Sequence, residues 1–113
     1  MDCLFCKIVS KQIDSNIIFE DDNIMAMHDI NPQAPVHLLI IPKKHISTIN
    51  EVQIEDTALV GQMVFVAKQL ATELNIDTLG YRLVFNVNNL GGQEIYHIHL
   101  HLLGGRQMTW PPG

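Results

Sequence analysis

The segment EIYHIHLHLLGG, residues 94–105, constrains the fold of this chain more than any other segment. In it histidine alternates with aliphatic residues, at His97, His99 and His101. Successive side chains of a β-strand point to opposite faces, so the alternation predicts a strand over 96–103 with three imidazoles on one face. The aliphatic residues between them are expected to enter a core. With 6 histidines in 113 residues, this spacing arises by chance only about 0.016 times, so composition alone does not explain it.

The other apolar patterns predict an α+β fold. Continuous apolar runs favour buried strands, and apolar residues recurring every three or four positions favour a helix. Strands in antiparallel-compatible pairs with one long helix between them do not fit an alternating βαβ fold. The expected elements are a short helix over 4–12, a hairpin within 16–30, a central strand over 36–42, a long helix over 54–74 and a strand over 81–87.

Length and composition indicate one small domain over residues 1–113, with 47% hydrophobic residues for its core. A formal net charge of −5 argues against a nucleic-acid-coating protein, which would carry clustered Lys and Arg. No segment approaches the roughly 20 apolar residues of a membrane helix, and the first residues lack the features of a signal peptide. We therefore expect a soluble cytoplasmic protein without nucleic-acid or membrane partners.

Three interpretations of the histidine face are open. The first is a solvated or hydrogen-bonded strand surface. The second is a metal site, although the outer histidines of an extended strand lie about 13 Å apart and could not easily share one ion. The third is nucleophilic catalysis, because imidazole is largely neutral near pH 7 and neighbouring histidines can fix its tautomer or donate protons. Glycine pairs at 91–92 and 104–105, together with Asn86, Asn88 and Asn89, favour the third interpretation and suggest a phosphate site.

The two cysteines, Cys3 and Cys6, form a C-x-x-C motif. A structural disulfide is not expected in the cytosol, and no strand can precede Cys3 as a thioredoxin-like motif would require. Half of a zinc site and two buried thiols are the interpretations that stay open.

The segments DINPQAPVHLLIIPKKHIS, GYRLVFNVN and GGQEIYHIHLHLLGGRQMTWPPG together resemble the histidine-triad (HIT) family. They are most similar to its Hint branch, the purine nucleoside phosphoramidases, and the resemblance runs from about Leu4 to Gly113. It implies an antiparallel sheet of about five strands with one long and one short helix, extended across a homodimer. It also implies binding of purine nucleoside monophosphate derivatives and cleavage of a P–N bond through a nucleotidylated histidine.

The resemblance assigns roles to particular residues. His99 resembles the nucleophile, His101 the residue at the phosphate and scissile bond, His97 the first triad histidine and His37 a histidine that orients the network. Two residues depart from the family pattern: Glu94 stands where many members carry Ser, and Met27 where an aromatic residue is common. The implied nucleotide-binding residues are Leu4, Phe5, Met27, His28, Asp29, Ile30, Asn86, Gly92 and Glu94.

In relatives with an N-terminal C-x-x-C, the resemblance implies a structural zinc site completed by two histidines. Here the four ligands would be Cys3, Cys6, His45 and His97, and catalysis would require no cofactor. Three alternatives to the phosphoramidase stay open: a nucleotide-sensing or scaffold dimer with incidental activity, a dinucleotide polyphosphate hydrolase, and a metal-dependent hydrolase that uses the histidines as ligands.

Overall fold

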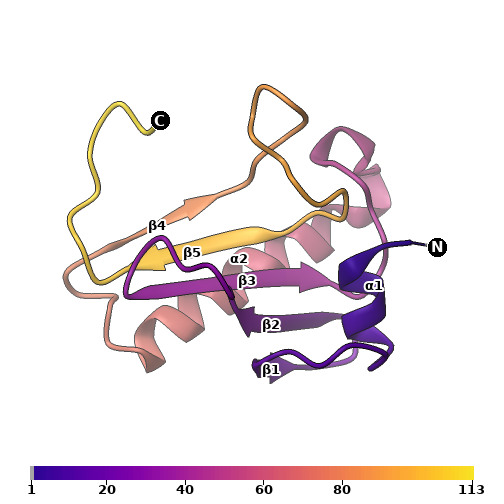
Figure 1. Cartoon of the computed structure of the whole chain (residues 1–113), viewed down its shortest axis with the longest axis horizontal. Helices are drawn as coiled ribbons and strands as arrows, with labels where there is room; N and C mark the ends of the chain where they lie inside the picture. Colours follow the sequence, from indigo (N-terminus) through magenta and orange to yellow (C-terminus); the bar gives the residue numbers. More distant parts are fainter. Residues whose placement is uncertain (1) are drawn as a thin grey trace.

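The computed structural model describes residues 2–113, and its five strands form one antiparallel sheet in the order β1-β2-β3-β5-β4 (Figure 1). Because β5 inserts between β3 and β4, the histidine-bearing strand lies beside the central apolar strand. The sheet confirms the expected α+β architecture. The strands are β1 (Ile17–Glu20), β2 (Ile24–His28), β3 (Val36–Pro42), β4 (Tyr81–Val84) and β5 (Leu100–Gly104).

Two helices lie on opposite faces of this sheet (Figure 1). The long helix α2 (Thr57–Glu73) packs its buried face against one side, and the short helix α1 (Leu4–Val9) covers part of the other. Two 3₁₀ turns, Ile49–Glu51 and Ile54–Asp56, lead into α2. No helix of the described residues 2–113 is long and apolar enough to cross a membrane.

Strand β3 is apolar along nearly its whole length because it contributes to two cores. Leu38 and Ile40 belong to the core beneath α2, whereas Leu39 and Ile41 belong to the core beneath α1. In β5, Leu100 and Leu102 join the α2 core, so His101 between them faces the α1 side. The sheet thus places the odd-numbered residues of β3 and β5 on one face, where the candidate site lies.

Four elements are shorter than the sequence indicates. The long helix α2 loses only its ends, because 54–56 form a 3₁₀ turn and the helix stops at Glu73. The first helix ends at Val9 rather than residue 12, since Lys11 takes a left-handed φ of 65°. Strand β4 ends at Val84 rather than residue 87. Strand β5 begins at Leu100 rather than residue 96, because the chain bends over 95–97 before it joins the sheet. His97 and His99 therefore precede the strand.

Candidate active site

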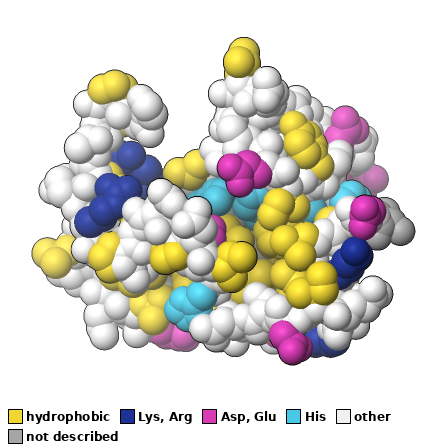
Figure 2. Space-filling model, in the orientation of Figure 1, with side chains coloured by type: hydrophobic (Ala, Val, Ile, Leu, Met, Phe, Trp, Pro, Cys, Tyr) yellow, Lys and Arg dark blue, Asp and Glu magenta, His cyan; other side chains and the backbone are white. Residues whose placement is uncertain are grey.

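A cavity of about 640 Å³ opens on the α1 side of the sheet. In Figure 2 histidine and hydrophobic side chains lie next to one another across the middle of this face. The cavity brings together residues from α1, the β2–β3 connection, the 85–99 segment and β5. Of the residues singled out in the sequence it is lined by Leu4, Phe5, Met27, His28, Asp29, Ile30, His37, Asn86, Gly92, Glu94, His99 and His101.

The apolar part of the lining comes from α1 and the neighbouring strands. Phe5 and Met27 are almost fully buried, and both belong with Leu39 of β3 to one hydrophobic core cluster. The Phe5 ring stands edge-on to the His99 imidazole, with 5.1 Å between the ring centroids. The apolar surface therefore continues up to His99, and such a lining is typical of small-molecule pockets.

His99 is buried and its proton position is fixed by the backbone. Its Nδ1 lies 2.8 Å from the carbonyl oxygen of His97. A carbonyl can only accept, so His99 carries its proton on Nδ1 and keeps the lone pair of Nε2. Burial lowers the pKa of His99, more than the charges of Asp29 and Glu94 raise it. The imidazole is therefore neutral near pH 7, and its free nitrogen is nucleophilic.

His101 has the opposite arrangement, which follows from a chain of hydrogen bonds. The backbone N–H of Gln33 donates to His37 Nδ1 at 3.0 Å, so a neutral His37 carries its proton on Nε2. His37 Nε2 lies 2.9 Å from His101 Nδ1 and donates to it. His101 consequently carries its proton on Nε2. That atom is buried and has no hydrogen-bond partner among the described residues, which leaves an N–H donor available to a ligand.

The pKa values of this pair are lowered together. Burial, followed by the neighbouring His99 and His37, lowers the pKa of His101 to about 4. Burial also lowers the pKa of His37, against the opposing effect of Asp29. His37 is thus neutral near pH 7, and its 3.4 Å contact with the Asp29 carboxylate is not an ion pair in the free protein.

Asp29 is held by a local turn. Its Oδ1 accepts a hydrogen bond of 2.8 Å from the backbone N–H of Asn31, which is the arrangement of an Asx turn. The same side chain lines the cavity and approaches His37 through Oδ2. The Asp29 carboxylate can therefore stabilise the turn and still accept hydrogen bonds in the cavity, because it keeps free lone pairs.

The loop after β4 is fixed by one buried amide. Gln93 Oε1 accepts from the backbone N–H of Asn88 at 3.0 Å, and Gln93 Nε2 donates to the carbonyl of Ser47 at 2.8 Å. Gly92 takes a φ of 81°, a conformation that glycine adopts readily. These contacts hold Asn86, Gly92 and Glu94 at the cavity. The prediction that Gly104 and Gly105 belong to a phosphate site is wrong, because neither lines this cavity. A Cβ on Gly104 would instead meet Ile76, and one on Gly105 would meet Pro35.

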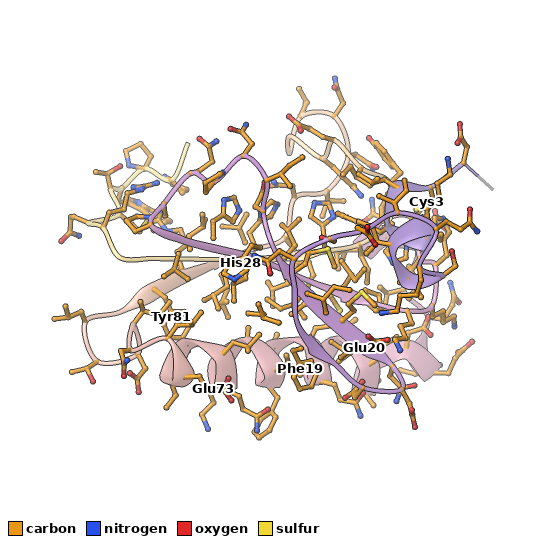
Figure 3. The ribbon with its side chains drawn as sticks, turned by 60° about the horizontal axis from the view of Figure 1, so that its bottom comes forward. Cys3, Phe19, Glu20, His28, Glu73 and Tyr81 are labelled. Carbon is orange, nitrogen blue, oxygen red and sulfur yellow. The ribbon has the colours of Figure 1, made fainter. Side chains whose placement is uncertain are left out.

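His97 does not line the cavity but joins a second group of side chains. Its Nε2 donates to the carbonyl of Pro42 at 2.8 Å, which leaves Nδ1 as a lone pair. That Nδ1 lies 3.5 Å from Cys3 Sγ, 3.6 Å from Cys6 Sγ and 3.2 Å from His45 Nδ1. All four ligand atoms lie within 4.8 Å of one another. Figure 3 shows Cys3 at the start of α1, across the sheet from α2.

Comparison with known proteins agrees with this geometry. The HIT domain family model matches residues 10–108. The chain belongs to the HIT family. A crystal structure of a HIT family hydrolase from Legionella pneumophila superimposes with a TM-score of 0.97, at 62% identity over 99% of this chain and 100% of that one. A histidine triad protein from Clostridium difficile superimposes with a TM-score of 0.93 at 38% identity, over 96% of this chain and 95% of that one.

Sequence relatives of this HIT protein include a named enzyme. The purine nucleoside phosphoramidase of Escherichia coli K12 is 49% identical over 105 residues, which are 93% of this chain and 88% of the relative. An uncharacterized HIT-like protein of Synechococcus elongatus is 46% identical over 99% of this chain and 97% of that one. The fold, the histidine motif and these relatives agree on a hydrolase of the HIT family.

Several backbone groups and side chains that form the site of this HIT protein were not identified from the sequence. The carbonyl of His97 and the N–H of Gln33 fix the histidine tautomers, but backbone groups leave no signal in residue types or spacing. Leu39 and Gln33 also line the cavity. The alternation of inward and outward residues in 36–42 could have identified Leu39, because it lies two residues from His37 on the same face.

Proposed function

We propose that this HIT protein is a purine nucleoside 5′-phosphoramidase, which cleaves a P–N bond through a nucleotidyl intermediate on His99. The observation that carries the proposal is the pair of opposite tautomers in one cavity: a lone pair on His99 and an N–H on His101. A displacement at phosphorus needs both a nucleophile and a donor for the departing group. The named activity of the Escherichia coli relative supports the same reaction.

The nucleoside is assigned to the apolar part of the cavity. Leu4, Phe5 and Met27 would contact the base, since they form a buried apolar wall. Asp29 would accept hydrogen bonds from the ribose hydroxyls, with His28 and Ile30 beside the sugar. Asn86, Gly92 and Glu94, on the loop after β4, would border the phosphate and the leaving group.

In the first step His99 Nε2 attacks the phosphorus, and the P–N bond to the amine breaks as the N–P bond to His99 forms. The amine needs a proton as it leaves. The phosphoramidate takes up this proton on its bridging nitrogen, so the amine departs neutral. His101 stays neutral because its Nδ1 accepts from His37, and its Nε2–H donates a hydrogen bond to the lone pair that the departing nitrogen gains.

In the second step water attacks the nucleotidyl-His99 phosphorus. The bond between phosphorus and His99 breaks, and the nucleoside monophosphate is released. One proton of the water stays on the monophosphate and the other passes to solvent, which offsets the proton taken up with the substrate. The sum is one water consumed, one amine and one nucleoside monophosphate formed. His99 recovers the tautomer that the carbonyl of His97 imposes.

A phosphoramidase should be distinguished from a dinucleotide polyphosphate hydrolase by its leaving group. A departing amine is stabilised by an N–H donor such as that of His101, whereas a polyphosphate needs charge neutralisation. We expect wild-type protein to cleave an adenosine 5′-phosphoramidate far faster than a diadenosine polyphosphate, without added metal. His99→Ala should abolish nearly all cleavage but retain nucleotide binding. Equal turnover of the two substrates would contradict the phosphoramidase assignment.

We further propose that Cys3, Cys6, His45 and His97 hold a structural zinc ion. With Zn–S bonds of about 2.3 Å and Zn–N bonds of about 2.05 Å, a tetrahedral ion separates S from N by about 3.5 Å and N from N by about 3.3 Å. The observed S–N separations of 3.3, 3.5 and 3.6 Å and the N–N separation of 3.2 Å fit these values. Four protein ligands would leave no open position, so the ion would serve stability only.

A further inference from the structure

Carboxylates line the proposed nucleotide cavity, and histidine is the one basic residue type among its described lining residues. Among the described residues, its lining contains three carboxylates, Asp14, Asp29 and Glu94, and neither Lys nor Arg. Figure 2 agrees, because the Lys and Arg side chains on this face lie toward its edges rather than in the middle. Sites for multiply charged phosphates usually provide Lys or Arg. Clefts lined by one sign of charge concentrate ligands of the opposite sign.

Asp14 and Glu94 are the two lining carboxylates that form no hydrogen bond or ion pair with any described residue; Asp14 lies between α1 and β1, whereas Glu94 lies on the loop after β4. Glu94 is exposed. Asp29, by contrast, accepts from the backbone of Asn31 and approaches His37. Glu94 lines the same cavity as His99, so its charge acts on a charged group that is bound there.

The position of Glu94 in the chain favours a contact with the leaving group. The apolar residues of α1, β2 and β3 account for the base, and Asp29 accounts for the ribose. The polar lining residues Asn86, Gly92 and Glu94 come from the loop after β4. A departing amine that extends beyond the phosphorus would meet this loop, and a negative charge on that amine would be repelled by an unpaired carboxylate.

We propose that Glu94 makes this enzyme selective for nucleoside phosphoramidates whose leaving amine carries a second, positively charged group, such as a diamine. The inference rests on the proposed phosphoramidase function and names its substrate class. A cationic group offsets the repulsion between the phosphoramidate anion and the acidic lining. An anionic leaving group adds to that repulsion. The free monophosphate product carries one more negative charge than the phosphoramidate, so the acidic lining favours its release.

The test uses three adenosine 5′-phosphoramidates of similar size, whose leaving amines are ethylenediamine, propylamine and β-alanine. For wild-type protein we expect kcat/KM to fall in that order, by roughly 10-fold or more from the cationic to the anionic amine at low salt. In Glu94→Gln, which keeps the shape of the side chain, the ratio should fall to less than about 3-fold. In Glu94→Lys the order should invert.

The control is Glu73→Gln, because Glu73 is an exposed carboxylate on α2, across the sheet from the cavity (Figure 3). This variant should keep the wild-type ratio, and added salt should reduce the ratio in both proteins. Cleavage of all three substrates at one rate, or an unchanged ratio in Glu94→Gln, would overturn the selectivity and leave the phosphoramidase function standing. Cleavage of none of the three would instead reject the proposed function.

Discussion

Four histidines of this protein do not all carry the proton on the same ring nitrogen, because each contacts a different partner. His99 and His97 donate to backbone carbonyls, through Nδ1 and Nε2 respectively, and His37 accepts from a backbone N–H. His101 receives its tautomer from His37. A lone pair therefore faces the cavity from His99, an N–H from His101, and a second lone pair faces the cysteines from His97. Because these tautomers are set before a substrate binds, no histidine has to change its tautomer during the reaction, and the site is preorganised.

At the scale of single residues, the cysteines test the zinc site. Cys3→Ser replaces a thiolate ligand with a hydroxyl, which binds zinc weakly. Protein purified without chelator should contain about one zinc per chain by elemental analysis, and the variant should lose most of it together with several degrees of Tm. Asp2→Asn, beside the motif but outside the group of four ligands, is the matched control. Metal-free wild-type protein with the same Tm as Cys3→Ser would contradict the site.

At the scale of elements, the turn after β5 positions the loop before β3. Arg106 Nε donates to the carbonyl of Gln33 at 2.9 Å, and the N–H of Gln33 fixes His37. Gly105, at a φ of 89°, lies so close to Pro35 that an added Cβ would approach the proline Cβ to 2.9 Å. The residues that follow the triad thus support the tautomer of His101 from outside the cavity.

Arg106→Ala should therefore lower kcat by roughly 10-fold with little change in KM, because the Gln33 loop loses one anchor while the nucleoside pocket stays intact. Nitrogen-15 NMR should show His37 as a mixture of tautomers. Arg82→Ala is the matched control, since Arg82 also donates to a backbone carbonyl, that of Thr109, at 2.9 Å. Wild-type kcat and a single His37 tautomer in Arg106→Ala would show that this hydrogen bond does not position the site.

The sequence predicts the position of an element correctly where the periodicity of its apolar side chains is sufficient to define it. The bounds of β3 match the predicted 36–42, and α2 follows the predicted apolar repeat, with Met63, Val66 and Leu70 buried. The start of β5 was wrong because the bend at 95–97 depends on contacts distant in sequence, including the bond from Ile98 N to the Ile46 carbonyl. Residue types in the cavity followed from the family resemblance, whereas the backbone donors and acceptors required coordinates.

At the scale of the whole molecule, the buried histidines predict the pH dependence of stability. The pKa of His101 is lowered from 6.5 to about 4, first by burial. The unfolded chain therefore binds more protons than the folded protein between these values, and the free energy of unfolding falls as pH falls through that window. Allowing for solvent screening, His101 alone should account for roughly 2 kcal/mol. Urea unfolding at several pH values should show a smaller loss in His101→Gln; an equal loss would contradict the assignment.

The whole molecule also offers surfaces for a second copy. Strand β4 ends the sheet, and its residues 81–84 are only half-buried. On the α2 face Val64 and Phe65 are exposed. The resemblance to the Hint branch implies a homodimer, so we expect about twice the 12.8 kDa chain mass by sedimentation at micromolar concentration. Arg82→Pro, which disrupts the exposed edge of β4, should favour the monomer. A wild-type monomer across that range would contradict the dimer.

The central claim is that His99 is transiently nucleotidylated. The most direct measurement is rapid mixing of excess enzyme with an adenosine 5′-phosphoramidate, an alkaline quench that preserves the acid-labile bond between phosphorus and histidine, and peptide mapping by mass spectrometry. We expect one adenylyl group on the peptide that contains 97–101, located on His99 and absent from His99→Ala. Rapid release of amine with no adduct on any histidine, or an adduct on His97 or His101 instead, would contradict the mechanism.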